Sequence, residues 1–492
     1  MRLLFSCYIL FLSISAFAEK ATVHITVKNF SGSVSVFDPQ FRYDLTKNSG
    51  VALPLDAHHT ASYIIDIDKP TGITLRFSNK FYNYDLFLSP GDELFLTVDF
   101  SRANHNITVS GRGSNNNQPE IFALTNMDTK VFDDDKTPDR LTAAINKQYL
   151  GNKEVLAKYI KVNKPSAEFI KNAKANLQYF APFNYYESYR CNIYGKPKKY
   201  QPKWQKIQDS LFAAAKMSNN NPLIVFNYTS LMNRFPIFEA GQLWNEYRND
   251  PAMFFKQWFH TDKARGEKLF NYAQLGFLVE KVIDKYFTGK AAEYAYGNAI
   301  KYLFHKADYP STVLLFDHFR KKYPKSIYLK GFSGPIAAVV AKQKQALSSK
   351  IAFVKDNGEK LNTFKEVLAL NKGKTVFIDM WGTWCGPCRE EIDKNAAKLR
   401  AHFAEKNIMF LYIANFDSTR EKEWRKQIAY FQLEGMHILA NPKLTNDIMA
   451  NAKASGYPTY IIVKKDGNYK QTTTKYPVNL QAMIKEIEAA NL

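Results

Sequence analysis

The chain has 492 residues, of which 46% are apolar and 15% aromatic, and its formal net charge is +21 at pH 7. This length suggests about three domains, and the apolar content is too high for a chain dominated by disorder. A basic chain can bind nucleic acid or an anionic membrane surface. No nucleic-acid-binding module is recognisable, so we expect no nucleic-acid partner and favour lysines that solvate the surface, while membrane-surface association stays open.

Residues 1–18 have the composition of an export signal. Arg2 precedes an apolar run that ends in the cleavage pattern Ala16-Phe17-Ala18. Because the run is too short for a stable membrane span, we expect cleavage after Ala18 and a location in the periplasm or cell envelope. Two alternatives stay open: a retained N-terminal anchor, and lipidation at Cys7, whose surroundings match an acylation site loosely.

Residues 19–117 have the pattern of a β domain. Val23, Ile25 and Val27 alternate with polar residues. Further apolar runs, separated by turn-forming residues, cover 63–67, 73–77, 84–88 and 94–100. Short alternating strands with frequent turns predict an antiparallel sandwich or partial barrel. A Gly- and Asn-rich stretch at 111–117 marks its end.

Residues 118–345 predict an all-α domain, because apolar residues recur three and four positions apart. The stretch from Ser311 to Tyr323 predicts an amphipathic helix that Pro324 ends. The basic, Pro-containing residues 194–199 are typical of an exposed loop. For Cys191 we favour a buried structural role over a redox role.

Residues 346–492 predict an α/β domain. Apolar runs typical of buried strands cover 376–380, 408–414 and 459–463, with helical patterns between them. Lys465-Asp466-Gly467 predicts a hairpin turn, and residues 479–490 predict a closing helix. Strands that alternate with helices in this way build one sheet covered by helices.

The chemistry-bearing motif follows the first of these strands. Cys385 and Cys388 lie in a tight loop that runs into a helix, whose apolar spacing continues from Ile392. Free N–H groups and the positive end of the helix dipole stabilise a thiolate at Cys385, which makes it the nucleophile. Cys388 lies within disulfide reach, and Pro387 suits the opening turn because it lacks an N–H.

Other uses of a Cys-x-x-Cys pair fit less well. Zinc needs a second ligand pair, and the sequence has no second Cys-x-x-Cys. Haem attachment needs His after the second Cys, where this chain has Arg389. A structural disulfide stays open, although it would not need the strand–loop–helix setting. We therefore expect neither a metal site nor a cofactor.

Asp379 ends the predicted strand behind the loop. A carboxylate on a buried strand has a raised pKa, which suits it to exchange a proton with Cys388. The alternative is a satisfied polar residue at a strand end.

The string Trp384-Cys385-Gly386-Pro387-Cys388 resembles thioredoxin, and with Arg389 and Glu391 it is similar to TlpA-like and ResA-like envelope oxidoreductases. The resemblance covers about residues 346–492. It implies a thioredoxin-like fold with Cys385 and Cys388 as the redox pair, and Trp384, Gly386 and Pro387 at the substrate.

The resemblance implies three further assignments. Glu391 matches a family Glu that tunes thiol acidity, with an ordinary surface Glu as the alternative. Tyr457 and Pro458 match the cis-proline loop, where the Tyr457 backbone would pair with a substrate strand. Asp393 stands where the family often has a helix-kinking Pro, which leaves the kink open. The β region resembles, in residues 87–92 and 107–111, the small domain that precedes thioredoxin domains in Bacteroidetes envelope proteins.

These features predict a periplasmic enzyme that reduces or exchanges disulfides in envelope proteins. Its partners would be protein thiols or disulfides and an unidentified electron donor. Gly386 and Pro387 favour the reducing direction by resemblance. The alternative is that residues 19–345 are a binding or scaffold module for an envelope protein or glycan, with the redox domain as an adaptor of little turnover.

Overall fold

The computed structural model describes most of the chain, with gaps. The described residues are 19–47, 50–78, 82–101, 106–124, 127–192, 201–216 and 226–491. The signal peptide expected at residues 1–18 and the loop expected at 194–199 lie outside them. The chain divides into two compact units: the first is Met1–Arg42 with Lys47–Arg234, and the second is Tyr43–Thr46 with Phe235–Leu492.

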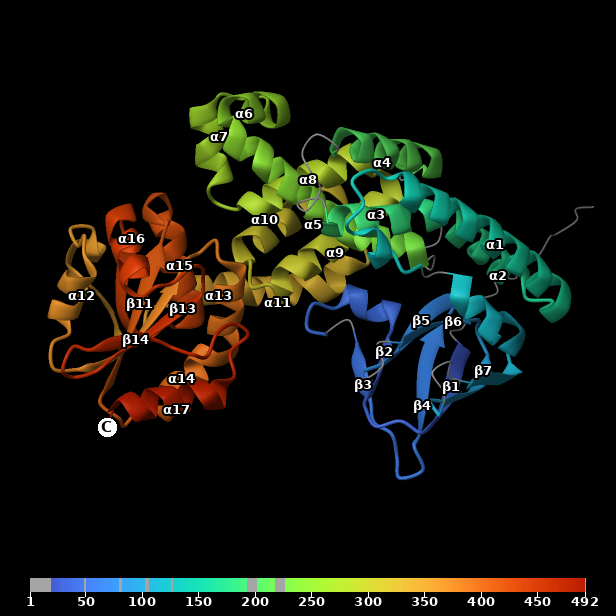
Figure 1. Ribbon diagram of the computed structural model, residues 1–492, viewed down its shortest axis with the longest axis horizontal. Helices are drawn as coiled ribbons and strands as arrows, with labels where there is room; N and C mark the ends of the chain where they lie inside the picture. The colour runs from blue at the N-terminus through green and yellow to red at the C-terminus, as the bar shows by residue number, and fades with distance from the viewer. Residues whose placement is uncertain are drawn as a thin grey trace, which may run out of the picture. The chain divides into compact units, whose positions relative to one another are not determined.

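The first unit begins with two four-stranded sheets, whose strand orders are β4-β1-β7-β8 and β3-β2-β5-β6 (Figure 1). Paired strands run antiparallel except β1 and β7, which run parallel. The strands are β1 (Glu19–Lys28), β2 (Val34–Phe37), β3 (Val51–Leu53), β4 (Thr60–Ile67), β5 (Thr71–Phe77), β6 (Tyr82–Leu88), β7 (Glu93–Asp99) and β8 (Asn106–Arg112).

Alternation along the strands builds the core of this domain. In β1, Val23, Ile25 and Val27 are buried, and the residues between them are partly exposed. Inward side chains of both sheets form one apolar cluster, which confirms a sandwich-like β domain. The sequence did not predict β2 and β3, because strands of four and three residues are too short to display an alternation.

Helices follow the β domain, as the spacing of apolar residues predicted. The first unit holds α1 (Asp139–Asn163), α2 (Ala167–Gln178), α3 (Phe180–Asn192) and α4 (Gln201–Ala215), and α5 (Phe226–Asn249) crosses the division between the units. Cys191 lies in α3, and its burial stays a prediction. The second unit holds α6 (Pro251–Phe259), α7 (Lys263–Phe270), α8 (Gln274–Tyr286), α9 (Gly289–His305), α10 (Tyr309–Lys322) and α11 (Tyr328–Lys344).

A short segment from the N-terminal part of the chain, Tyr43–Thr46, belongs to the second unit. The Lys301 ammonium of α9 donates to the Asp44 carbonyl at 2.9 Å. The rings of Tyr43 and Tyr328 meet edge to face, with centroids 4.8 Å apart. These contacts fix the segment on helices α9 and α11.

The second unit ends in a six-stranded mixed sheet of order β14-β13-β10-β11-β12-β9. The strands are β9 (Ile351–Phe353), β10 (Thr375–Trp381), β11 (Ile408–Asn415), β12 (Gly435–Ala440), β13 (Thr459–Val463) and β14 (Tyr469–Gln471). The helices are α12 (Phe364–Leu370), α13 (Gly386–Glu391), α14 (Ala397–His402), α15 (Glu421–Phe431), α16 (Pro442–Asn451) and α17 (Leu480–Asn491).

Helices cover both faces of this sheet. One apolar cluster joins it to α13, α14, α15 and α17, and another joins it to α12 and α16; Figure 1 shows α14 and α17 on one side of the strands and α12 and α16 on the other. Because both faces are covered, β10 is buried along its whole length. The strand predicted at 459–463 is confirmed residue for residue.

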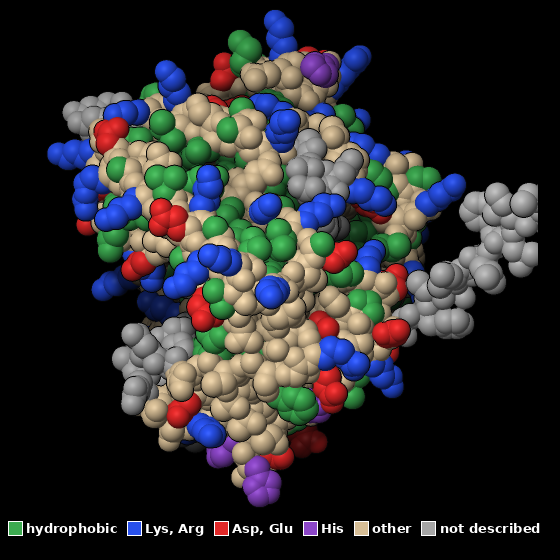
Figure 2. All heavy atoms as spheres, turned by 90° about the vertical axis from the view of Figure 1, so that its right-hand side faces the viewer, with side chains coloured by type: hydrophobic (Ala, Val, Ile, Leu, Met, Phe, Trp, Pro, Cys, Tyr) green, Lys and Arg blue, Asp and Glu red, His purple; other side chains and the backbone are tan. Residues whose placement is uncertain are grey.

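Charged side chains are mixed on the surface. On the face drawn in Figure 2, Lys and Arg side chains are widely spread and stand among Asp and Glu. This distribution agrees with lysines that solvate the surface. Among the described helices, none combines the length and apolar composition needed to cross a bilayer.

Candidate redox site

Strands β10 and β11 end beside the candidate site, and hydrogen bonds connect their C-terminal ends. β11 lies parallel to β10, and β13 lies antiparallel on its other side. The Asn415 amide donates to the carbonyl of Trp381 at 3.0 Å and to that of Ile413 at 2.8 Å. Its side-chain oxygen accepts from the Thr445 hydroxyl at 3.0 Å. These hydrogen bonds therefore fix the position at which the loop after β10 begins.

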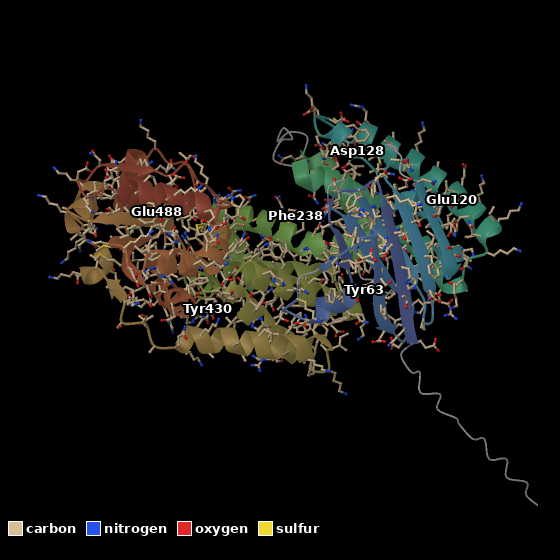
Figure 3. All side chains as sticks on the ribbon, turned by 90° about the horizontal axis from the view of Figure 1, so that it is seen from below. Tyr63, Glu120, Asp128, Phe238, Tyr430 and Glu488 are labelled. Atoms are coloured by element: carbon tan, nitrogen blue, oxygen red, sulfur yellow. A yellow bond between two sulfur atoms is a disulfide. The ribbon has the colours of Figure 1, made fainter. Side chains whose placement is uncertain are left out.

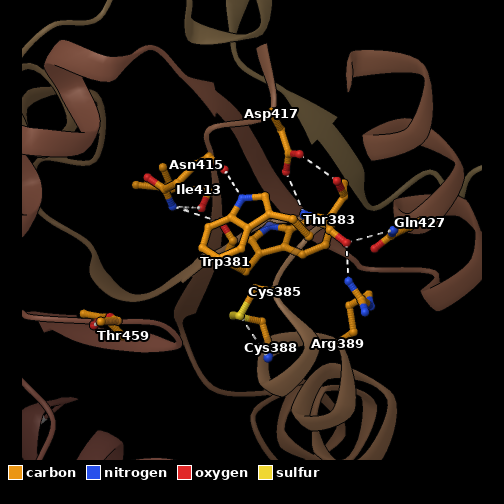
Figure 4. The surroundings of a disulfide bond; sticks show 12 residues. Trp381, Thr383, Cys385, Cys388, Arg389, Ile413, Asn415, Asp417, Gln427 and Thr459 are labelled. Atoms are coloured by element: carbon orange, nitrogen blue, oxygen red, sulfur yellow. Dashed lines mark hydrogen bonds between the residues drawn. A yellow bond between two sulfur atoms is a disulfide. The ribbon is translucent and has the colours of Figure 1, made fainter. Parts of the chain in front are cut away.

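Cys385 and Cys388 form a disulfide at the start of α13 (Figure 4). Cys385 is the residue that caps the helix, and its Sγ accepts a hydrogen bond from the Cys388 N–H at 3.2 Å. Pro387 lies in the first turn, as its missing N–H predicted. Cys385 and Cys388 are 3% and 1% exposed, so both residues of the disulfide are buried.

The active-site helix changes its winding after Glu391. A π turn, Ile392–Ala396, separates α13 from α14. Asp393, which stands where the family often has a helix-kinking Pro, lies inside this turn. Burial raises the pKa of its carboxyl. The helix therefore has an irregular turn here without proline, and such turns are frequent at functional sites.

Asp379 lies on β10, on the face of the sheet that packs the two cysteines. Burial, reinforced by the negative charge of Glu391, raises the pKa of its carboxyl to about 8. Its Oδ1 is buried and has no hydrogen-bond partner among the described residues. A proton acceptor with a pKa near neutrality can both take up and return a proton.

Glu391 is buried as well, at 6% exposure. It accepts hydrogen bonds from the Asn395 amide at 2.7 Å and from the Val478 N–H at 3.1 Å. It is therefore not an ordinary surface residue.

Asp379 and Glu391 line the same cavity, together with the polar side chain of Asn395 and apolar neighbours. Its volume is about 30 Å³, and a water molecule needs about 10–15 Å³ on this measure. The cavity therefore has room and polar partners for water beside the Asp379 carboxyl.

Three aromatic side chains, those of Trp384, Phe416 and Tyr457, contact one another, and Trp384 directly precedes Cys385 in the chain. Trp384 is 39% exposed, and its indole N–H donates to the Asn415 carbonyl at 2.8 Å. Its ring meets that of Tyr457 edge to face at 5.5 Å. Phe416 is 53% exposed, with its ring 6.2 Å from that of Trp384. The Tyr457–Pro458 peptide bond is cis, as the resemblance implied.

A buried cluster of polar side chains forms hydrogen bonds to the loop between β10 and α13. The sequence did not predict this cluster. Asp417 accepts from the N–H of Thr383 at 2.7 Å and from its hydroxyl at 2.6 Å (Figure 4). The Thr383 carbonyl accepts from the guanidinium of Arg389, which is 4% exposed, and from the Gln427 amide. The sequence used Arg389 to exclude haem attachment and as part of the family resemblance, but it did not predict the burial of this side chain, because nothing in a single sequence marks a buried arginine.

The described residues contain no group of three or more His, Cys, Asp or Glu placed to hold a metal ion. The reactive groups described at the site are the two sulfurs of Cys385 and Cys388 and the Asp379 carboxyl group on the same face of the sheet.

The fold and the site define a thioredoxin-like thiol–disulfide oxidoreductase domain. Residues 351–490 match the family model described as Redoxin, and the chain belongs to the redoxin family through this domain.

Known proteins match part of the chain. An uncharacterised protein of Haemophilus influenzae is 30% identical over 121 residues, which are 23% of this chain and 71% of that protein. The thioredoxin-like protein YneN of Bacillus subtilis is 34% identical over 98 residues, 20% of this chain and 54% of that protein. The thioredoxin domain of a thiol–disulfide oxidoreductase from Bacteroides vulgatus is 22% identical with a TM-score of 0.22, and the match covers 25% of this chain and 84% of that structure.

Proposed function

We propose that the chain is a thiol–disulfide oxidoreductase of the bacterial periplasm or cell envelope, which reduces or exchanges disulfides in envelope proteins. The observation that carries the proposal is the Cys385–Cys388 disulfide at the N-terminus of α13, on the same sheet face as a carboxyl group with a pKa near neutrality. The composition of residues 1–18 supports the compartment.

The reaction follows from the placement of the two sulfurs. In the reduced protein the Cys385 thiolate attacks a substrate disulfide, which forms a mixed disulfide and releases one substrate thiolate. Asp379 in its ionised form then takes the proton of Cys388, and the resulting thiolate attacks Cys385 Sγ, which breaks the mixed disulfide and releases the second substrate thiolate. Two electrons pass to the substrate, and the protein keeps the Cys385–Cys388 disulfide.

A dithiol protein in the envelope must supply two electrons to restore the reduced form. Tyr457, beside the cis-proline, would pair its backbone with an extended substrate segment, and the exposed ring of Trp384 would contact the same segment.

Trapping in the native organism tests this function. In the full-length Cys388→Ala variant the second attack cannot occur, so mixed disulfides between Cys385 and envelope proteins should accumulate and disappear on treatment with dithiothreitol. The matched control is Cys385→Ser, which should trap nothing and lose disulfide exchange. If Cys385→Ser keeps the function of the wild type, the scaffold alternative holds and the enzyme proposal fails. Fractionation of cells tests the compartment, because a cytoplasmic pool alone would contradict it.

A further inference from the structure

One carboxylate of the helical region, that of Asp308, lies close to the redox centre. Asp308 caps α10, where its side chain accepts from the Ser311 N–H. Its Oδ2 lies 3.7 Å from Nη2 of Arg389, and the two side chains are only 14% and 5% exposed. Asp308 lies outside residues 351–490, so the redoxin match does not contain it.

Arg389 is built into the active-site loop. Its backbone N–H donates to the Cys385 carbonyl at 3.1 Å, and its guanidinium donates to the Thr383 carbonyl. An ideal Cβ placed on Gly386 would lie 3.9 Å from Nη2. The guanidinium therefore lies beside the residues that hold the nucleophilic sulfur.

The charge of this guanidinium needs a counter-charge, because a buried and unpaired cation is strongly unfavourable. The groups that interact with it are Asp308, Asp417 and Tyr309, and these interact in turn with Glu423, Arg420 and Asp393. Asp417 already bonds to Thr383 and lies 3.9 Å from Arg420. Asp308 is the carboxylate that pairs with Arg389 within 4 Å among the described residues.

Neighbouring contacts hold Asp308 in place. The hydroxyl of Tyr430 donates to that of Tyr309 at 2.8 Å, and their rings lie 4.2 Å apart (Figure 3 labels Tyr430). The Lys306 ammonium lies 2.9 Å from a Glu390 carboxylate oxygen. Tyr309, the first residue of α10, is thus held against α15, and Lys306, which follows α9, is held against Glu390 of α13, so the two contacts flank Asp308 along the chain.

We propose that Asp308 is a positioning residue of the redox centre, which sets the stability of the Cys385 thiolate by neutralising Arg389. The inference rests on the proposed function and adds that the helices before the redoxin domain help to set its reduction potential. With Asp308 uncharged, the full positive charge of Arg389 acts on the loop and stabilises the thiolate. The reduced form then becomes more stable, and the protein becomes a stronger oxidant.

Two variants with opposite effects test the proposal in the full-length protein. In Asp308→Asn the alkylation profile of Cys385 should move to lower pH by about half a unit to one unit. The equilibrium with glutathione should shift three- to tenfold toward the dithiol, where tenfold corresponds to about 30 mV. Arg389→Met should move both quantities the other way. Asp308→Glu, which keeps the charge, should stay close to wild type.

The matched control is Asp317→Asn on the same helix, because Asp317 is 45% exposed and pairs with Arg320; it should change neither quantity. If Asp308→Asn behaves like Asp317→Asn, or if Asp308→Asn and Arg389→Met shift in the same direction, the inference is wrong. If Asp308→Asn does not fold, Arg389→Met decides, since an unchanged thiol titration contradicts the proposal. A wild-type protein that does not exchange with glutathione contradicts the proposed function instead.

Discussion

At the scale of single residues, the site contains a buried carboxyl group, that of Asp379, which lines a small cavity. An unfolded Asp loses its proton near pH 4, whereas folded Asp379 keeps it until about pH 8. Between these values the unfolded state binds fewer protons, so the stability of the protein falls as the pH rises. The chain keeps a group that weakens its own fold, which is typical of a residue retained for chemistry.

Asp379→Asn should therefore be more stable and less active. At pH 7 the free energy of unfolding should rise by on the order of 4 kcal/mol, and the gain should vanish near pH 4. The resolving step should slow by about 100-fold because Cys388 loses its proton acceptor. Urea unfolding from pH 4 to pH 8 and the lifetime of a mixed disulfide measure the two effects. A pH-independent gain in stability would contradict the assigned proton.

The sequence alone indicated the site residues that lie close to one another along the chain. It did not indicate residues that contact each other only in the folded protein. Cys385, Cys388 and Asp379 stand within one strand–loop–helix segment, where spacing alone places them. Arg389 and Asp308 are far apart in the sequence, and only the folded chain brings their side chains together. The redox pair was therefore predictable, and the charges that surround it were not.

At the scale of elements, the loop between β10 and α13 is shaped by backbone contacts as much as by side chains. A Cβ on Gly382 would lie 2.4 Å from the indole nitrogen of Trp384 and 3.0 Å from the Asn415 carbonyl. These are the two partners of the hydrogen bond that holds the indole. Glycine at this position lets the tryptophan cross the end of β11.

Gly382→Ala should displace the Trp384 indole and break its bond to Asn415. We expect a loss of stability of about 1–3 kcal/mol and a slower reaction with protein disulfides than with small disulfides. Thermal unfolding and the two exchange rates measure this. Gly456→Ala is the control, since a Cβ there has no atom within 4 Å among the described residues; an equal effect in both variants would exclude the steric explanation.

Element prediction succeeded where one buried strand forms a continuous apolar run and failed where the run is broken. β13 appeared with its full length because all five residues are apolar or β-branched. β12 (Gly435–Ala440) was missed because Gly435 and His437 interrupt its pattern. His437 is nevertheless buried, and burial lowers its pKa to about 4, so a neutral ring packs against Tyr412.

At the scale of the whole molecule, the second unit includes more than the redoxin domain and its preceding helices. The segment Tyr43–Thr46 lies so close to α11 that a Cβ on Gly331 would be 1.9 Å from the Tyr43 carbonyl oxygen. A glycine is required there because a backbone atom cannot move aside as a side-chain tip can.

Gly331→Ala should therefore lower the melting temperature, with a loss of about 1–3 kcal/mol. The matched control is Gly334→Ala on the same helix, where a Cβ meets no described atom within 4 Å. That control should change stability by no more than about 1 kcal/mol, because the better helix propensity of alanine is opposed by crowding between its Cβ and the ring of Pro335. Calorimetry of both variants checks the pair, and a stabilised Gly331→Ala would show that Tyr43 is not seated on the helix.

Because of the segment Tyr43–Thr46, cleavage of one peptide bond cannot divide the chain into its two units. The chain enters the second unit at Tyr43, leaves it after Thr46, and returns for good at Phe235. A protease that cleaved only beside Arg234 would yield an N-terminal piece still carrying four residues that complete the other piece. The nicked protein should elute from gel filtration as one particle and separate into two chains only in denaturant.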